Sequence, residues 1–202
     1  MILALDTSTA ACTAALFDES GECVARADEL IGRGHAERLA PMLAELLDGR
    51  RADTILVGTG PGSFTGIRVG IAAAHGLAIG WDAKLFGMSS LGLLAASSAA
   101  EAEIAAAMNG GHGELFVQQF GRDLDAAGDI LNLAPAEAAK AISADIAAGP
   151  GAQALIDARG YGRAVEAWPS AANAMRLPER LRSLAPVPVY ARAPDAKTKS
   201  AA

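Results

Sequence analysis

Glycine dominates the stretch Val57-Gly58-Thr59-Gly60-Pro61-Gly62-Ser63-Phe64-Thr65-Gly66-Ile67-Arg68-Val69-Gly70, which also holds a proline and three hydroxyl side chains. It follows a short apolar run, residues 54–57, and precedes a long apolar segment, residues 67–79. Glycine permits positive φ and close backbone approach, proline fixes a turn, and a hydroxyl side chain can cap a helix. The pattern therefore predicts a strand, a tight turn and a helix that is capped by Ser63 or Thr65.

Such a junction points backbone N–H groups and the positive end of a helix outward, which suits an anion or the backbone of another chain. A Walker A loop needs Lys and then Ser or Thr after its last glycine, whereas Gly66 precedes Ile67 and Arg68. The Rossmann fingerprint needs glycine where Thr65 stands, and a nucleophile elbow needs glycine at the position of Pro61. None of the three fits, and a turn that only caps a helix stays open as the alternative.

The chain of 202 residues is long enough for one compact domain or two small ones, with a core that needs no disulfide or metal. Its formal net charge of -6 argues against a broad basic surface for nucleic acid, so contact with RNA is expected to run through a partner.

Cys12 and Cys23 are expected to be reduced, small apolar fillers. No secretory leader precedes the first strand pattern, and Gly, Asp and Lys interrupt the apolar region 67–94, so we expect a cytoplasmic protein that does not enter the membrane.

Strand and helix patterns alternate along the first half. We expect a three-strand meander at 2–6, 12–17 and 22–28, a helix His35–Leu47 kinked by Pro41, strands at 54–57 and 84–87, and helices at 67–79 and 89–100, the last capped by Ser89 or Ser90. In the second half we expect strands at 103–108, 114–120, 145–148 and 163–166 and helices at 136–142, 152–158 and 171–177. No internal repeat is visible, the chain beyond Pro178 is expected to be irregular, and the expected division is two lobes, residues 1–100 and 101–202.

This order of elements resembles the half-domain of the actin, Hsp70 and sugar-kinase (ASKHA) fold. In that fold, three antiparallel strands precede helices that alternate with parallel strands. The first of these strands ends here at Asp6-Thr7. Residues 58–70 resemble the signature of the TsaB family, the dimerisation subunits of the bacterial machinery that makes threonylcarbamoyladenosine in tRNA. Residues 3–9, 35–42, 87–91 and 188–195 fit the same family. The resemblance implies an α/β fold with two lobes of mixed sheet flanked by helices.

The chain departs from the family pattern at particular positions. Asn109-Gly110-Gly111 stands where relatives usually carry Asp-Ala-Arg, and Gly92 stands where they usually carry Glu. The middle of the second lobe also looks shortened. No role that the family gives to the second lobe is therefore carried over to this chain.

The resemblance implies a non-catalytic scaffold. In the family, this kind of chain binds and activates the related catalytic subunit TsaD, which transfers threonylcarbamoyl to the adenosine next to the anticodon, and an ATPase, TsaE, acts on the pair. TsaD binds its metal through two histidines whose positions here hold Ser90 and Leu94. Leucine cannot coordinate a metal, and a lone serine hydroxyl is a poor ligand. We therefore expect no catalytic residue, metal or cofactor on this chain, ATP and metal on the partner subunits, tRNA contact only through the complex, and a homodimer when the chain is alone.

The helices at 35–47 and 67–79 are expected to form the partner interface, because each carries apolar side chains on more than one face. One face should cover the sheet, and the other, rich in Ala and Gly, would allow a close approach of helices from a second chain. Core packing explains part of this pattern equally well. Arg68 lies where a cation opposes the helix dipole, so a specific partner is expected, with a surface salt bridge as the alternative. The candidate interface residues are His35, Arg38, Leu39, Met42, Leu43, Leu46, Arg68, Ile71, Ala74, His75 and Ala78.

A residual nucleotide or anion site is the alternative for the glycine loop. In that case the competing function is an ATP-dependent kinase or hydrolase of the actin-like superfamily, although Thr7 replaces the glycine that would let the backbone approach phosphate. Asp6 could instead hydrogen-bond the turn that it starts. Ser63 is expected to cap its helix rather than to act with His35 or His75 in a hydrolytic triad. The candidate contacts are Asp6, Thr7, Gly60, Gly62, Ser63 and Thr65.

Overall fold

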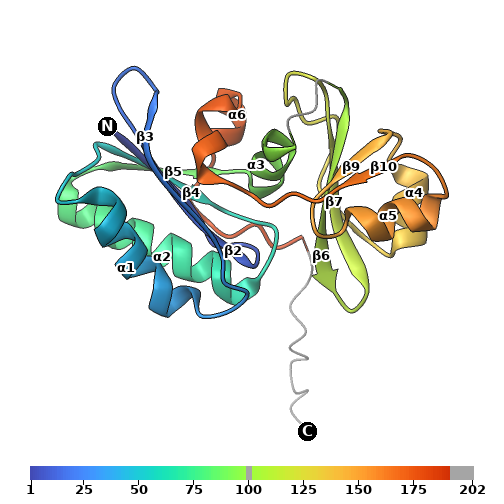
Figure 1. The fold of residues 1–202 in the computed structure, drawn as a ribbon, viewed down its shortest axis with the longest axis horizontal. Coiled ribbons are helices and arrows are strands. Elements are labelled where there is room, and N and C mark those ends of the chain that lie inside the picture. Colours follow the sequence, from blue (N-terminus) through green and yellow to red (C-terminus); the bar gives the residue numbers. More distant parts are fainter. Residues whose placement is uncertain (99–101, 192–202) are drawn as a thin grey trace, which may run out of the picture.

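The computed structural model describes residues 1–98 and 102–191. Figure 1 shows two lobes, each built on a sheet that is flanked by helices. The sheet of the first lobe has the order β3-β2-β1-β4-β5, and β1 runs antiparallel to β2 and parallel to β4. The elements of this lobe are β1 Ile2–Asp6, β2 Ala11–Phe17, β3 Cys23–Leu30, α1 His35–Leu47, β4 Thr54–Gly58, α2 Phe64–Trp81, β5 Lys84–Met88 and α3 Ser90–Ser97.

The second lobe repeats the topology of the first. Its sheet has the order β10-β9-β6-β7-β8, and β6 runs antiparallel to β7 and parallel to β9. The two lobes share a backbone path rather than residue identities, which is why the sequence shows no repeat. This arrangement confirms the expected α/β fold of the ASKHA type. The elements are β6 Ile104–Gly111, β7 Glu114–Phe120, β8 Leu131–Leu133, α4 Pro135–Ala141, β9 Ile146–Ala148, α5 Ala152–Arg159 and β10 Arg163–Val165.

Both faces of the first sheet are covered. Alternate residues of a strand point to opposite faces, so Leu5 packs with Leu39 and other side chains under α1 and α2, while Ala4 belongs to the core on the other side. That second core is closed by α3 and by a 3-10 helix, η1 Ala171–Arg176, whose Ala171 is completely buried. The first sheet is thus a central layer with helices on both sides.

Helix α3 lies between the two sheets (Figure 1). Ser89 caps it, because its hydroxyl accepts a hydrogen bond from the N–H of Gly92 at 3.0 Å. Leu93 packs in the core of the first lobe, whereas Leu91 and Leu94 pack in the core of the second. A helix that is apolar all round is a buried helix. Helix α3 is buried because its side chains pack in the cores of both lobes.

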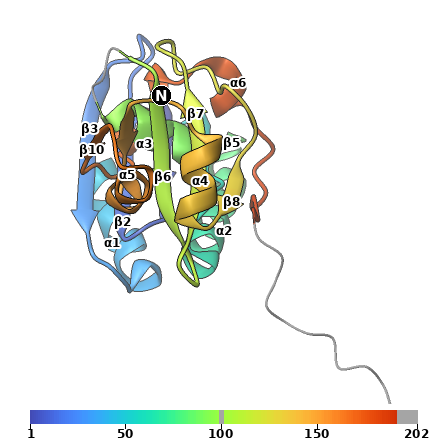
Figure 2. The same cartoon turned by 90° about the vertical axis from the view of Figure 1, so that its right-hand side faces the viewer.

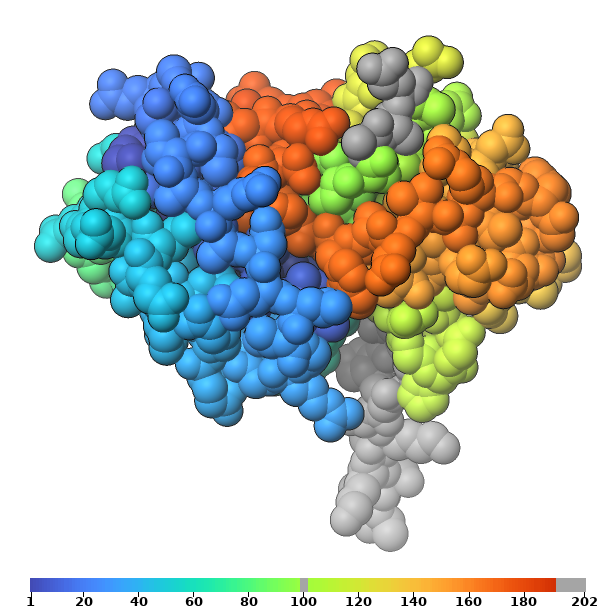
Figure 3. Space-filling model, viewed as in Figure 1, coloured from blue at the N-terminus to red at the C-terminus, as the bar shows by residue number. Residues whose placement is uncertain are grey.

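The C-terminal part of the chain returns to the first lobe, so a division into 1–100 and 101–202 does not describe the lobes. The N–H of Ala171 donates to Oγ1 of Thr13 on β2 at 2.8 Å. A short helix, α6 Glu179–Arg182, packs beside β5, and the N–H of Val189 donates to the carbonyl of Thr59 at 2.8 Å. Figure 3 shows orange late-chain atoms between the blue strands and green α3, and Figure 2 shows the molecule from the side of the second lobe. The second lobe is therefore an insertion between α3 and η1.

Most of the expected elements are present. Ser63 caps α2, which extends beyond both ends of the expected helix. The structure adds β8 and α6, and it forms the expected helix 171–177 as a 3-10 helix. Cys12 is buried as expected, but Cys23 is exposed, because it lies on β3 at the edge of the sheet, so it is not a filler. Residues 99–100 of an expected helix and 192–195 of the family match lie outside the described residues.

Within the described ranges, the structure contains no helix with the length and apolar character needed to cross a membrane.

Candidate functional site

The glycine loop lies directly against the turn between β1 and β2. The N–H of Ser63 donates to the carbonyl of Ser8 at 2.7 Å, and the Thr7 hydroxyl donates to the carbonyl of Gly66 at 2.7 Å. A Cβ at Gly62 would lie 2.1 Å from the Ser8 oxygen, and one at Gly66 would lie 2.0 Å from the Thr7 oxygen. Both distances are too short for any side chain. The close approach that glycine permits therefore serves the chain's own turn.

Asp6 ends β1 and is completely buried. Its Oδ1 accepts hydrogen bonds from the N–H and the hydroxyl of Ser8, both at 2.7 Å, and its Oδ2 accepts one from the Ser90 hydroxyl at 2.5 Å. Burial raises the pKa of Asp6, while these hydrogen bonds oppose the rise. The interpretation of Asp6 as a residue that stabilises its own turn is confirmed.

Ser90 and Leu94 are both engaged within the fold rather than directed at a ligand. The Ser90 hydroxyl donates to Asp6 and accepts from the N–H of Gly60 at 3.0 Å. Leu94 is completely buried in the core of the second lobe. Among residues 1–98 and 102–191, the His, Cys, Asp and Glu side chains do not form a group of three that could hold a metal ion.

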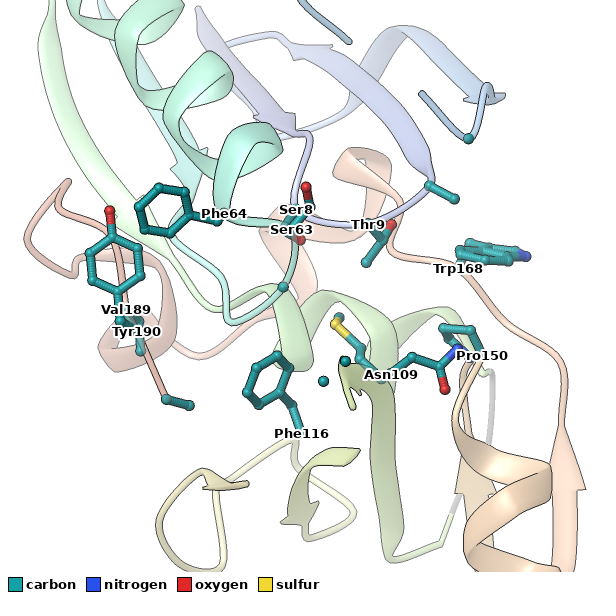
Figure 4. A pocket seen from close by; sticks show the side chains of 17 residues that line it. Ser8, Thr9, Ser63, Phe64, Asn109, Phe116, Pro150, Trp168, Val189 and Tyr190 are labelled. Carbon is teal, nitrogen blue, oxygen red and sulfur yellow. The ribbon is translucent and has the colours of Figure 1, made fainter. Parts of the chain in front are cut away.

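A cleft of about 730 Å³ lies between the lobes, beside the glycine loop (Figure 4). In this view, Ser8 and Ser63 lie on one side and Phe116 on the other, with Trp168 and Tyr190 at opposite ends. None of the lining residues that the structure describes is charged. They are Ser8, Thr9, Ala10, Gly32, Gly62, Ser63, Phe64, Met108, Asn109, Gly110, Gly111, Phe116, Pro150, Trp168, Val189, Tyr190 and Ala191.

The structure separates the candidates for an anion site. Gly62 and Ser63 line the cleft. Asp6, Thr7 and Gly60 are buried behind it, and the exposed Thr65 is not among its lining residues. The loop and the turn thus make one wall of the cleft, but most of the expected polar contacts do not face it.

Sequence reasoning missed the aromatic residues of the cleft. Phe116 and Trp168 belong to no motif, and the chain brings them together only through the second lobe and the segment that follows it. Tyr190 lay in a segment that resembles the family, residues 188–195, which was the one available signal.

Many of the interface candidates on α1 and α2 belong to the chain's own core. The apolar stripe of each helix covers the sheet, and the ring of His35 lies 3.3 Å from the carbonyl of Ala11. A partner cannot contact these side chains while the lobe is folded, so the expectation that they form the outer surface is corrected. The residues concerned are His35, Leu39, Met42, Leu43, Leu46, Ile71 and Ala74.

The two arginine candidates have partners within the chain. Arg38 forms a two-point ion pair with Glu29, with nitrogen–oxygen distances of 2.6 and 2.7 Å. Arg68 donates from Nε to the hydroxyl of Tyr190 at 3.0 Å, and its guanidinium lies 3.6 Å from the centroid of the Phe64 ring. Arg68 is therefore held by an internal aromatic pair rather than by a surface salt bridge, and its place in a partner interface stays a prediction.

The outward side of α1 and α2 carries small and apolar residues next to exposed charged ones, Glu37 and Glu45 on α1 and Arg68 on α2. Ile79 is 83% exposed. A Cβ added to Gly76 or Gly80 would meet nothing within 4 Å, so no described contact requires glycine there. Of the other candidates, His75 is exposed and Ala78 is half-buried. We call the small and apolar part of this surface, together with His75, the outer helix face. Its exposed residues are Ala36, Ala40, Pro41, Ala44, Ala72, His75, Gly76, Ile79 and Gly80.

A family model described as "TsaD: tRNA N6-adenosine threonylcarbamoyltransferase" matches residues 28–196. The chain belongs to this family. Its curated relatives include the tRNA threonylcarbamoyladenosine biosynthesis protein TsaB of Escherichia coli, which is 35% identical over 130 residues, covering 60% of this chain and 55% of the relative. TsaB of Haemophilus influenzae is 41% identical over 99 residues, covering 46% of this chain and 41% of the relative. The chain thus spans about half the length of these curated relatives.

Solved structures extend the match to both lobes. A protein from Pseudomonas aeruginosa, described as uncharacterised with similarity to peptidase YEAZ, has a TM-score of 0.78 and 32% identity, covering 95% of this chain and 99% of its own. YeaZ from Pseudomonas aeruginosa has a TM-score of 0.75 and 28% identity, covering 94% and 98%. The resemblance to TsaB that the glycine stretch predicted is confirmed by these relatives.

Proposed function

We propose that this chain is the non-catalytic scaffold subunit of a bacterial tRNA threonylcarbamoyladenosine synthase, and that its outer helix face binds and activates a TsaD-type catalytic subunit. The names of the TsaB relatives support the pathway, and the match to the TsaD model supports pairing between two related chains. In this proposal a TsaE-type ATPase acts on the pair, tRNA is reached only through the complex, and the chain works in the cytoplasm. Alone, the same face pairs two copies of the chain.

The observation that carries the proposal is the placement of glycines along α2. Gly66 and Gly70 face inward, where a Cβ would lie 2.0 and 2.5 Å from atoms of Thr7, so the fold requires them. Gly76 and Gly80 face outward into open space. A glycine in a helix interior costs about 1 kcal/mol relative to alanine. Another helix can approach closely where no Cβ intervenes, which gives the outward glycines a use.

The polar groups of the first lobe support a role without catalysis. Asp6 and Ser90 hydrogen-bond each other in a buried site, and Leu94 lies in the core. Metal or substrate chemistry needs such groups to be directed at a bound ligand. On this chain Asp6 and Ser90 stabilise the fold, and the catalytic chemistry belongs to the partner subunit in this proposal.

The test is co-elution with the TsaD protein of the same organism in size-exclusion chromatography. Ala72→Arg and Ile79→Glu place a charge on the outer helix face without touching the core, and each should abolish co-elution. Ala154→Arg makes the same change on an exposed residue of α5 and should leave the complex intact. Complex formation by Ala72→Arg and Ile79→Glu at the wild-type level would contradict the proposed face.

The competing function is a kinase or hydrolase of the actin-like superfamily. The cleft beside the glycine loop favours it, and the uncharged lining opposes it, because phosphates need cationic or N–H partners. It predicts magnesium-dependent turnover of ATP by the isolated chain, and a lower turnover when Asn109→Trp narrows the cleft. The scaffold proposal predicts no turnover by either protein.

A further inference from the structure

The cleft between the lobes is distinct from the outer helix face and has an unusual composition. Charged residues make up 20% of the chain, so roughly three of seventeen lining residues would be charged if the cleft were an average sample. Among the lining residues of the described chain, none is. An ion that enters this cleft loses hydration and meets no charged side chain among these described residues, which is costly. The lining therefore selects against charged ligands.

Aromatic side chains border the cleft on several sides. Phe116 lies below it in Figure 4, Trp168 lies at one end, and Phe64 and Tyr190 lie toward the other. Phe64 and Tyr190 already stack on each other, with ring centroids 5.2 Å apart. Aromatic rings prefer offset or edge-to-face partners, which stabilise a bound ring beyond the area that it buries. A flat ring is the ligand shape that such walls accept.

The polar groups of the cleft are neutral hydrogen-bonding groups. Asn109 offers an exposed amide at the end of β6. Thr9 and Ser63 use their oxygens to accept from the N–H groups of Ala11 and Gly66, so each hydroxyl can still donate. A volume of about 730 Å³ falls within the usual range for small-molecule sites. We propose that this cleft binds a small, uncharged ligand with a flat aromatic ring.

Arg68 is a cation that contacts two lining residues of the cleft. Its guanidinium lies over the Phe64 ring and its Nε donates to Tyr190, so it packs behind two lining residues rather than lining the cleft itself. An anionic ligand would be favoured if Arg68 set the preference of the site. The charge of the ligand is therefore the variable to test.

The experiment is calorimetric titration of the full chain with three probes that share one ring. Indole is neutral, indole-3-acetate is an anion and tryptamine is a cation. Indole should bind with a sub-millimolar Kd, and both charged probes should bind at least about tenfold more weakly. No binding of indole, or equal or tighter binding of a charged probe, would overturn the proposal.

Two matched variants place the binding in the cleft. Asn109→Asp adds one negative charge to the lining, so it should strengthen tryptamine several-fold, weaken indole-3-acetate and change indole less than about twofold. Gln153→Glu makes the same amide-to-carboxylate change on an exposed residue of α5 and should alter none of the three. An equal response of the probes to both variants would show that they bind elsewhere. A negative result in this binding test would not contradict complex formation through the outer helix face, which co-elution tests separately.

Discussion

The hydroxyl of Ser90 lies 2.5 Å from Oδ2 of Asp6, and this contact joins the end of β1 to the first turn of α3. Because α3 packs in the cores of both lobes, a single buried carboxylate fixes the helix that ties them together. Asp6 thus has a structural role, and its substitution should lower the stability of the fold.

Asp6→Ala should lower the free energy of unfolding by about 3 kcal/mol or more, because buried donors left without an acceptor cost about 1–3 kcal/mol each. The donors concerned are the N–H and hydroxyl of Ser8 and the hydroxyl of Ser90. Urea denaturation followed by circular dichroism measures the loss. Ser90→Ala, which leaves the two Ser8 bonds in place, should cost less. A wild-type urea midpoint for Asp6→Ala would mean that the carboxylate does not tie the lobes.

The pH dependence of stability should report the same carboxylate. Burial raises the pKa of Asp6 above its ordinary value of 3.8, so the folded chain holds this proton to higher pH than the unfolded chain does. The stabilisation from the bound proton is complete below the unfolded pKa and is lost as pH rises through the folded pKa. The difference in unfolding free energy between wild type and Asp6→Asn should therefore shift in favour of the variant as pH rises above the ordinary pKa of 3.8 and through the raised pKa of the folded state. A difference that stays constant across this range would contradict the raised pKa.

One substitution should have opposite effects at two positions of α2. Gly66→Ala places a Cβ 2.0 Å from the Thr7 oxygen, so the turn must shift, and stability should fall by about 1–3 kcal/mol. Gly76→Ala enters open space and improves helix propensity, so stability should rise by up to about 1 kcal/mol. Thermal melting of the two variants compares them directly. Destabilisation by Gly76→Ala would reveal a contact that the fold does not account for.

Tyr190 should hold the C-terminal segment against the glycine loop. Its ring stacks on Phe64 and its hydroxyl accepts from Arg68, and the neighbouring N–H of Val189 donates to the carbonyl of Thr59. In Tyr190→Ala, hydrogen exchange of the Val189 amide should accelerate at least about tenfold, because local opening becomes easier. Tyr190→Phe keeps the stack and should accelerate exchange less. Unchanged protection in both variants would show that Val189 is held independently of the aromatic pair.

Local rules predicted the glycine junction correctly. Ser63 accepts from an N–H of its own first turn, and Pro61 and the glycines make the turn before it, so every part of that inference lies within one short segment. The three-strand meander and the caps of α2 and α3 followed for the same reason. The resemblance of residues 58–70 to a family signature then predicted the fold of the whole chain.

Long-range contacts decided what the sequence could not predict. Leu39 and Met42 looked available to a partner, because the apolar pattern of α1 does not say whether the chain's own sheet or a second chain covers it. The return of Ala171 to Thr13 joins residues 158 positions apart, and no local pattern announces it. Trp168 reaches the cleft through the same return.

The covering of the first sheet by η1 has a consequence for synthesis. A nascent chain emerges N-terminus first, yet one side of the first sheet, with Ala4, Phe17 and Leu56, waits for residues of η1, which are made only after the second lobe. Any product that stops before Ala171 presents this apolar surface to water and to chaperones. Burial of this side of the first sheet therefore waits until synthesis has passed η1.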